Sequence, residues 1–228
     1  AYVVPDVAHH FDYRPMAAQM QAEFAGLRVF VVGEAGDGQT EHAALMDGVA
    51  GDDDAAIQAT LATARFDPTD VATMLLSGGT TALPKLIPRT HDDYVLNAKA
   101  SGRVARIDES TVMLIILPLG HNYPLASPGM LGAFYHGGTV VIAQGTGVDD
   151  VFALVQRERV TVIAAVVPLI TTWLNSPALS AYDHSSLEVV QNGGARLAPE
   201  LRRRLRQQLG CTPQEIYGTA EGLINMTR

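Results

Sequence analysis

Cysteine and long apolar runs are scarce in this chain. Cys211 is the only cysteine among 228 residues, which excludes an internal disulfide and a cysteine-based zinc site. A chain of this kind suits a reducing compartment, so we expect it to be cytoplasmic. No apolar run reaches the roughly 18 residues of a membrane-spanning helix. The first residues, AYVVPDVAHHFDYR, lack the basic and apolar regions of a signal peptide, and we expect no membrane partner.

Basic residues are also few. Lys and Arg number 16 against 24 Asp and Glu, which gives a formal net charge of −8. No broad positive field is therefore available to hold a polyanion such as DNA, and we expect no nucleic-acid partner. Charged residues make up 18% of the chain and apolar residues 47%, the composition of a globular protein with a buried core.

Short β-branched runs alternate with helix-like stretches, which predicts βα units around a mostly parallel sheet. The predicted strands are 28–33, 72–77, 112–118, 139–143, 160–167, 187–192 and 214–217, and the predicted helices are 13–25, 91–101, 129–136, 149–157, 169–175 and 199–209. Residues 33–54 lack periodicity and are expected to form a surface loop. One α/β domain over residues 1–228 is the expected organisation.

The segment SGGTTALPK follows the predicted strand ATMLL and combines glycine, hydroxyl and lysine side chains. Its candidate phosphate-binding residues are Ser77, Gly78, Gly79, Thr80, Thr81 and Lys85. Glycines let the backbone approach an anion, hydroxyls bond phosphate oxygens and lysine adds charge. The residue order differs from a Walker loop. The residues alone leave two alternatives, a phosphate-binding loop or an ordinary Gly/Thr-rich turn.

A second polar cluster follows the predicted strand VMLIILP, in the segment LPLGHNYPLASPG. His121, Asn122, Tyr123 and Ser127 supply donors, acceptors and one aromatic face, and such a cluster can form one wall of a small pocket. Taken alone, a His-Asn pair after a strand is more often a satisfied loop hydrogen bond than a catalytic unit.

Two more candidate segments, QNGGARLAPE and QEIYGTAEGLINMTR, lie near the end of the chain. Bare backbone at Gly193 and Gly194 lets a flat ring approach, and Tyr217 supplies a stacking face, which suits adenine. Glu221 follows a Gly-Thr turn, where a carboxylate can hold Mg²⁺ that bridges phosphates. The plainer alternatives are two turns and a solvated glutamate. Because all four segments follow predicted strands, we expect them to open on one cleft.

In order and spacing, these four segments resemble the adenylate-forming superfamily of acyl-CoA synthetases, nonribosomal adenylation domains and luciferases. SGGTTALPKLIPRTHDDY and HNYPLASPG are similar to the matching stretches of its aryl-acid adenylating enzymes. Within that group, the chain resembles the 2,3-dihydroxybenzoate–AMP ligases. The resemblance implies a mostly parallel sheet flanked by helices, the flavodoxin-like subdomain of an adenylation domain. It also implies that a preceding segment and a C-terminal lid domain lie outside residues 1–228.

The resemblance implies a ligase that uses ATP and Mg²⁺ to activate an aryl carboxylic acid as an aryl-adenylate. The acyl group then passes to the phosphopantetheine thiol of an aryl carrier protein, in siderophore or nonribosomal peptide biosynthesis. 2,3-Dihydroxybenzoate is favoured, with salicylate and a hydroxyanthranilate as alternatives. Two other hypotheses stay open: an isolated, catalytically incompetent substrate-binding subdomain or scaffold module, and an unrelated nucleotide-binding α/β protein.

Residue roles follow from the resemblance. The ATP-binding set that it implies is Ser77, Gly78, Gly79, Thr80, Thr81, Lys85, Gly193, Gly194, Ala195, Tyr217, Gly218, Thr219 and Glu221. The substrate-binding set is Asn122, Tyr123, Ser127, Gly194 and Ile224, with Asn122 bonded to the ring hydroxyl ortho to the carboxylate. His121, Lys85 and Glu221 are the implied catalytic residues, and Glu221 is the implied Mg²⁺ ligand.

Two conspicuous residues and one cluster are expected to be structural. Trp173 lies on an apolar predicted helix and is expected in the core. Cys211 lies just before a predicted strand and is expected to be structural, because no His-Asn partner set suggests a thiol nucleophile. The arginines of residues 202–206 lie on a predicted helix, where a solvated face is expected rather than a phosphate site.

Ser127 generates a prediction about the ring. Within the resemblance, serine accompanies 2,3-dihydroxybenzoate and cysteine accompanies salicylate, because a hydroxyl pairs with the 3-hydroxyl of the ring. A full-length enzyme that carries this segment is expected to prefer 2,3-dihydroxybenzoate, and Ser127→Cys is expected to shrink the preference. Pyrophosphate exchange with each acid measures it. If exchange with salicylate equals exchange with the dihydroxy acid and Ser127→Cys leaves both unchanged, Ser127 does not determine which ring substituents are accepted.

Overall fold

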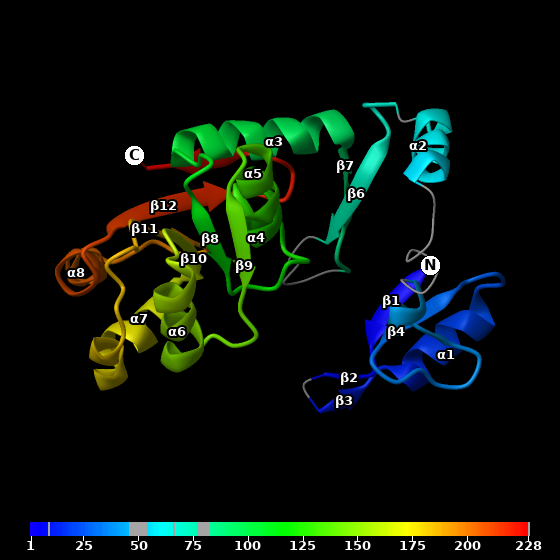
Figure 1. Cartoon of the computed structure of the whole chain (residues 1–228), viewed down its shortest axis with the longest axis horizontal. Helices are drawn as coiled ribbons and strands as arrows, with labels where there is room; N and C mark the ends of the chain where they lie inside the picture. Colours follow the sequence, from blue (N-terminus) through cyan, green and yellow to red (C-terminus); the bar gives the residue numbers. More distant parts are fainter. Residues whose placement is uncertain (9, 46–53, 66, 77–82, 228) are drawn as a thin grey trace. The chain divides into compact units, whose positions relative to one another are not determined.

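The computed structural model describes residues 1–8, 10–45, 54–65, 67–76 and 83–227 (Figure 1). They group into two compact units, residues 1–65 and residues 66–228, and each unit is described by itself. The sequence led us to expect one α/β subdomain over residues 1–228. Membership of both units in a single subdomain stays a prediction.

The first unit is built around a small parallel sheet in the order β1-β4-β5. Ala17 of its main helix packs against the valines of β1 and β4. Its elements are β1 (Tyr2–Pro5), β2 (Val7–Ala8), β3 (Phe11–Asp12), α1 (Arg14–Glu23), β4 (Val29–Val32), β5 (Thr40–Glu41), the 3-10 turn η1 (His42–Leu45) and α2 (Asp54–Thr63). β5 and η1 fall in the predicted surface loop, because elements of two and four residues leave no periodic signal.

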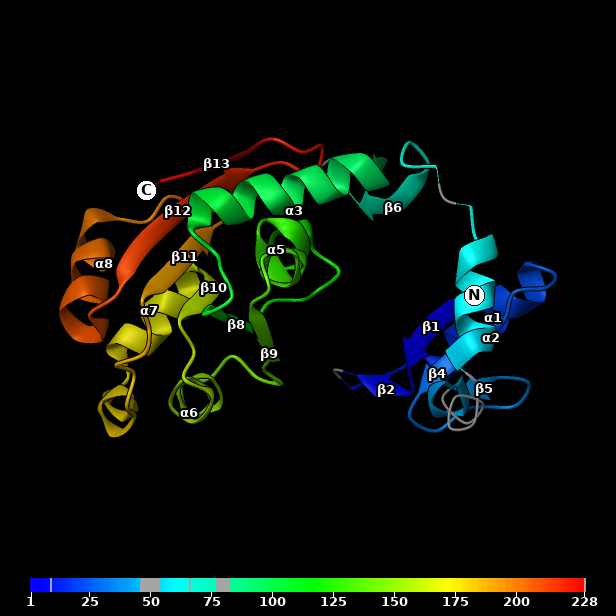
Figure 2. The ribbon, with the colours of Figure 1, turned by 45° about the horizontal axis from the view of Figure 1, so that its top comes forward.

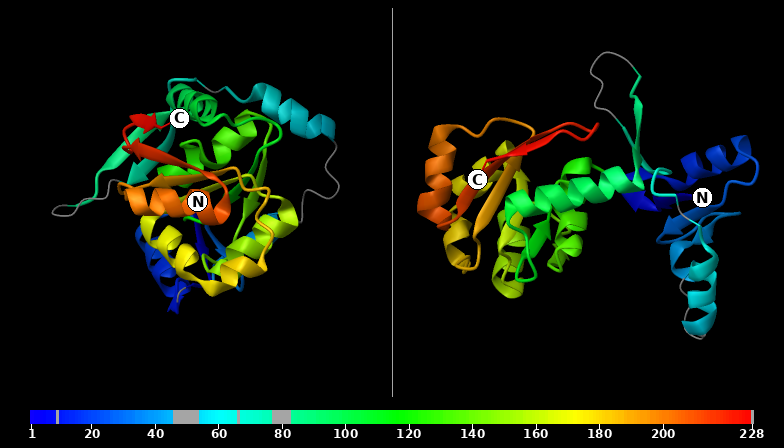
Figure 3. Two further views of the ribbon diagram at one scale, coloured as in Figure 1. Left: turned by 90° about the vertical axis from the view of Figure 1, so that its left-hand side faces the viewer. Right: turned by 90° about the horizontal axis from the view of Figure 1, so that it is seen from above.

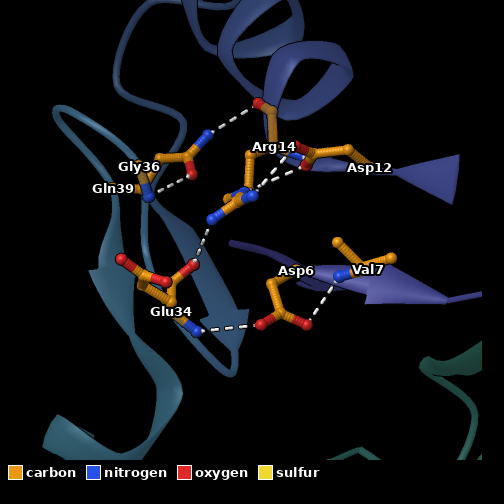
Figure 4. A network of polar contacts seen from close by, with 7 residues as sticks. All are labelled: Asp6, Val7, Asp12, Arg14, Glu34, Gly36 and Gln39. Carbon is orange, nitrogen blue, oxygen red and sulfur yellow. Dashed lines mark hydrogen bonds and ion pairs between the residues drawn. The ribbon is translucent and has the colours of Figure 1, made fainter.

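Polar contacts fasten the start of α1 to the neighbouring loops (Figure 4). Arg14 donates to the Asp12 carboxylate through Nε at 3.0 Å and Nη2 at 2.9 Å, and through Nη1 to the carbonyl of Glu34 at 3.4 Å. Gln39 donates from Nε2 to the carbonyl of Arg14 at 2.8 Å. Asp6 accepts from the backbone N–H of Glu34 at 3.1 Å. Because these side chains are solvent-accessible, the contacts fix loop geometry more than they stabilise the fold.

The second unit contains a six-stranded sheet in the order β13-β12-β11-β10-β8-β9. Its strands are β8 (Val112–Ile115), β9 (Thr139–Ile142), β10 (Val162–Val166), β11 (Val189–Gly193), β12 (Thr212–Gly218) and β13 (Ile224–Met226). β13 pairs antiparallel with β12, and every other pair is parallel. Counted along the chain, the parallel strands lie in the order 2-1-3-4-5 of flavodoxin-like sheets. The predicted α/β class with a mostly parallel sheet is confirmed.

Helices cover both faces of this sheet (Figure 2). They are α3 (His91–Ala105), α4 (Asn122–Ala126), α5 (Gly129–Tyr135), α6 (Val148–Glu158), α7 (Val167–Asn175), the 3-10 turn η2 (Pro177–Ala181), α8 (Pro199–Arg204) and the π turn η3 (Leu205–Leu209). On one face, α3 and α5 pack on Met113, Ile115 and Val162. On the other face, α6, α7 and η3 enclose Leu114 and Ile163. Burial on both faces explains why these strands lack alternation.

Trp173 and the arginines of α8 show how well burial was predicted. Trp173 is fully buried and meets Phe152 edge to face, with ring centroids 5.7 Å apart, so it lies in the core as predicted. The solvated arginine face is only partly right. Arg202 forms an ion pair with Glu215, and Arg204 donates to the carbonyl of Leu174, both in half-buried positions.

One predicted strand pairs differently from what we expected. β6 (Val71–Leu76) was expected in the parallel sheet, but it pairs antiparallel with β7 (Leu86–Thr90) in a separate two-stranded sheet. This hairpin lies against α3, which begins after it (Figure 3). The apolar run of β6 predicts a strand without specifying its partner. Pro88 hides β7 from a sequence pattern, because proline cannot donate to a strand ladder.

Cys211 generates a prediction about reactivity. Its thiol is buried, and burial raises its pKa to about 12. Since the thiolate is the reactive form, iodoacetamide at about pH 8 is expected to leave Cys211 unmodified in the folded protein and to modify it fully in guanidinium chloride. Intact mass measures the modification. Equal rates in both conditions would show that the folded protein exposes the thiol.

Candidate functional site

A cavity of about 750 Å³ opens at the carboxyl ends of the parallel strands in the second unit. Its lining includes Pro118 after β8, Val166 at the end of β10, Gly193 at the end of β11 and Gly218 at the end of β12. β9 and β10 flank β8 on opposite sides, although they follow it in sequence. Open α/β sheets bind ligands at such a reversal of strand order. The volume suits a small organic ligand.

The short helix α4 carries the polar wall of this cavity. His121 caps its first turn, with Nδ1 accepting a hydrogen bond from the backbone N–H of Tyr123 at 3.1 Å. In the neutral ring the proton therefore lies on Nε2. Both residues line the cavity, together with Asn122 between them. We did not predict α4, because five residues that include Pro124 give no helical period.

Tyr123 lies over the end of β11, and Gly193 makes room for it. A Cβ atom built on Gly193 would lie 2.7 Å from Cε1 of Tyr123, closer than carbon atoms approach without displacement. The Tyr123 hydroxyl donates to the carbonyl of Ala165 at 3.4 Å, and burial raises the pKa of the phenol, which stays protonated. The backbone of Gly193 thus packs against the tyrosine ring, and its place in the adenine site stays a prediction.

Two residues of α3 hold the polar wall from behind. Tyr94 donates from its hydroxyl to Oδ1 of Asn122 at 2.9 Å. Asn97 donates from Nδ2 to the carbonyl of Ala126 at 2.6 Å and to Oγ of Ser127 at 3.4 Å. Asn122 also donates from Nδ2 to Oγ of Ser127 at 3.4 Å. The sequence analysis missed Tyr94 and Asn97, although Tyr94 ends the stretch SGGTTALPKLIPRTHDDY that carries the family resemblance.

Arg89 joins β7, α3 and the loop after β12. Its side chain is 2% exposed and forms an ion pair with Asp93. Its Nη1 donates to the carbonyl of Ala220 at 2.8 Å, and its guanidinium carbon lies 5.2 Å from the ring centroid of Tyr94. We missed this residue as well. The signal was an arginine inside an apolar strand, since buried charges need partners.

Most described residues of the predicted site meet in this cavity. Those that line it are His121, Asn122, Tyr123, Ser127, Gly193, Gly194, Gly218 and Thr219. Those that do not are Lys85, Ala195, Tyr217, Glu221 and Ile224. Ser77, Gly78, Gly79, Thr80 and Thr81 lie outside the described residues. Three of the four predicted segments thus open on one cavity, while the ligand assigned to each residue stays a prediction.

Three of the predicted residues outside the lining have clear positions. Tyr217 is 66% exposed on β12, and it points away from the face of Ile216 because strand side chains alternate. Ile224 packs with Tyr123 and Ile216, and lines a second cavity of about 460 Å³ beside α3. Glu221 is exposed in the loop after Thr219. Among the described residues, no three His, Cys, Asp or Glu side chains gather as a metal site.

Comparison with known proteins decides the family. Residues 2–228 match the AMP-binding enzyme family. The chain belongs to this family. The match excludes the hypothesis of an unrelated nucleotide-binding protein whose loops only mimic the signature. Within the described part of this family member, no helix combines the length and apolarity needed to cross a membrane.

Individual members of the AMP-binding enzyme family are similar over the whole chain. The 2,3-dihydroxybenzoate-AMP ligase of Bacillus subtilis is 42% identical over 228 residues, which cover 100% of this chain and 40% of that protein. The salicyl-AMP ligase / salicyl-S-ArCP synthetase of Mycobacterium tuberculosis is 43% identical over 99% of this chain and 39% of its own length. The chain spans about two fifths of the length of these relatives.

A solved structure shares the fold of this AMP-binding family member. The apo structure of MbtA from Mycobacterium smegmatis superposes with a TM-score of 0.84 at 35% identity. The match covers 100% of this chain and 40% of the solved chain. The fold seen here is therefore that of a related, solved protein.

The contact between Gly193 and Tyr123 generates a prediction. Gly193→Ala is expected to displace the ring and lower the free energy of unfolding by about 1–3 kcal/mol, as overpacking does. Gly120→Ala is the matched control, because Gly120 lines the same cavity and a Cβ there meets nothing within 4 Å. Urea unfolding of both variants measures the difference. Equal stabilities would show that the ring shifts without cost.

Proposed function

We propose that the protein containing this chain activates a small aryl carboxylic acid with ATP to form an aryl-adenylate, with 2,3-dihydroxybenzoate as the favoured acid. The observation that carries the proposal is the polar wall of Asn122 and Ser127 in an otherwise mainly apolar cavity. Family membership supports the adenylate. The names of the relatives give 2,3-dihydroxybenzoate and salicylate as the acids that those proteins activate.

The cavity suits an aromatic ring with adjacent polar substituents. Leu75, Leu117 and Val166 supply apolar walls, and Tyr123 supplies an aromatic one. Asn122 Nδ2 and Ser127 Oγ lie 3.4 Å apart, so together they reach two neighbouring positions of one ring. That spacing supports an acid with substituents ortho and meta to its carboxylate.

In the proposed reaction, the aryl carboxylate attacks the α-phosphate of ATP, and pyrophosphate leaves. No covalent bond to the enzyme forms, so rate enhancement comes from positioning and from charge neutralisation. His121 supports this step, because its Nε2–H is available to donate while Nδ1 caps α4. Lys85, Thr219 and residues 77–81 are proposed to hold phosphates, and Gly193, Gly194, Ala195 and Tyr217 the adenine.

Glu221 is the residue that we propose for Mg²⁺. It is an exposed carboxylate two residues after Thr219, which lines the cavity. One carboxylate beside bound phosphates fits Mg²⁺, which keeps several waters and prefers phosphate oxygens. When bound, the ion would neutralise charge on the phosphates.

The later step and the location belong to the same proposal. The aryl-adenylate passes its acyl group to the phosphopantetheine thiol of an aryl carrier protein, in siderophore or nonribosomal peptide biosynthesis, and AMP leaves. The name of the Mycobacterium tuberculosis relative, a salicyl-S-ArCP synthetase, supports a carrier partner. The single, buried cysteine supports a reducing compartment such as the cytoplasm.

A second candidate function is ligand binding without catalysis. It is favoured by Lys85, Tyr217 and Glu221, which lie outside the lining of the cavity. Pyrophosphate exchange separates the two functions when it is assayed with residues 1–228 and with a full-length enzyme carrying them. Exchange by the longer protein alone makes this chain a binding subdomain. If neither exchanges pyrophosphate with any aryl acid, the proposed activation is wrong.

Asn122 generates the prediction that tests recognition of the acid. Asn122→Ala is expected to weaken aryl-acid binding by about 0.5–1.5 kcal/mol, the usual worth of one hydrogen bond, and to leave ATP binding unchanged. Asn175→Ala, at an exposed asparagine at the end of α7, is the control. Titration calorimetry with each ligand measures the effect. An equal loss for both ligands would remove Asn122 from the acid site.

A further inference from the structure

Tyr94 carries a hydrogen-bond donor that is buried outside the lining of the cavity. Its side chain is 7% exposed and packs with Leu75 and Ala126, and it is absent from the cavity lining. Burial raises the pKa of the phenol, so the hydroxyl keeps its proton. The neighbouring Arg89 has only donor groups and cannot accept that proton. Among the described residues, the Tyr94 hydroxyl donates to Oδ1 of Asn122.

The buried proton of Tyr94 decides how the Asn122 amide is turned. If the amide were reversed, its nitrogen would donate to the Tyr94 oxygen, and the Tyr94 proton would be left without this acceptor. A buried donor without a partner is unfavourable, so the observed orientation is selected. Oδ1 then faces Tyr94, and Nδ2 faces Ser127 and the cavity. One N–H of Nδ2 remains for a ligand.

Asn97 sets the direction of Ser127 in the same way. Its amide orientation is fixed, because Nδ2 donates to the carbonyl of Ala126, a group that only accepts. The same nitrogen lies 3.4 Å from Oγ of Ser127, which also accepts from Asn122. With both lone pairs engaged, the hydroxyl proton of Ser127 is the part left for a ligand.

We infer that Tyr94 and Asn97 are positioning residues that set the polarity of the acid site. They make Asn122 and Ser127 both donate toward the ligand, so the site selects aryl acids with an acceptor oxygen ortho to the carboxylate over 2-amino acids. This inference rests on the proposed function and narrows its substrate class.

The chemistry of the two kinds of acid explains the selection. In a 2-hydroxybenzoate, the hydroxyl proton bonds to the adjacent carboxylate, and the oxygen is free to accept from Asn122. In a 2-aminobenzoate, the nitrogen lone pair is delocalised into the ring, and an N–H points outward. Two donors then face each other, and neither is paired. Salicylate and 2,3-dihydroxybenzoate fit this wall, and a hydroxyanthranilate does not.

The test compares salicylate with anthranilate, which differ only in the ortho substituent, a hydroxyl in the first and an amino group in the second. Dissociation constants are measured by titration calorimetry with a full-length enzyme that carries this segment. Anthranilate is expected to bind about tenfold more weakly than salicylate or worse. In Tyr94→Phe the ratio is expected to fall below about threefold, because the Asn122 amide is then free to turn. Tyr182→Phe, which removes a hydroxyl bonded to Asp149 outside the cavity lining, is expected to keep the ratio.

Asn122→Asp provides a second variant of nearly equal shape. The carboxylate still accepts from Tyr94 but has no N–H for the ligand. It is expected to weaken salicylate more than anthranilate, and so to reverse the preference. The melting temperature and ATP affinity of each variant show whether its fold is intact.

The outcomes separate this inference from the proposed function. A ratio that Tyr94→Phe leaves within twofold of the wild-type value overturns the inference, and so does an equal loss of both acids. Equal wild-type binding of both acids also overturns it and leaves the activation reaction standing. Absence of pyrophosphate exchange with every aryl acid overturns the proposed function itself.

Discussion

The buried guanidinium of Arg89 is the constraint on which the candidate site depends. A charge removed from water must be paired, and its partners come from α3 and from Ala220, which is 131 residues further along the chain. Satisfying that charge brings the hairpin, the helix and the loop after β12 to one place. The ring of Tyr94 lies under the same guanidinium. The polar wall of the cavity is therefore supported by an ion pair outside the cavity lining.

Strand order supplies the rest of the site. Because β9 and β10 flank β8 on opposite sides, the chain after β8 stays clear of the sheet edge and is free to form α4. The ends of β11 and β12 then face it with Gly193 and Gly218, and the end of β10 faces it with Val166. The sheet thus sets the position of the cavity, and α4 supplies polar side chains that line it. This division is common in open α/β folds, where the scaffold is rigid and loops carry function.

The sequence predicted those parts of the fold that depend on local patterns. Strands such as β8 and helices such as α6 are long apolar or amphipathic runs, and both were found within a few residues of their true bounds. Pairing was harder, because β6 is as apolar as β8 and yet pairs with β7. Site residues were found where a motif names them. Arg89, Tyr94 and Asn97 were missed, since their importance lies in contacts between distant segments that no spacing rule encodes.

The packing of Tyr123 on Gly193 has a consequence for how such a pocket diversifies. The phenol ring occupies the space that a side chain on β11 would take, so the two positions share one fixed volume. A larger residue at 193 is tolerated only after the ring at 123 shrinks, and a shrunken ring leaves a void until 193 grows. A change of pocket depth during evolution therefore needs substitutions at both 193 and 123, and either substitution alone is unfavourable. We expect the depth of the pocket to be retained while residues at its entrance vary.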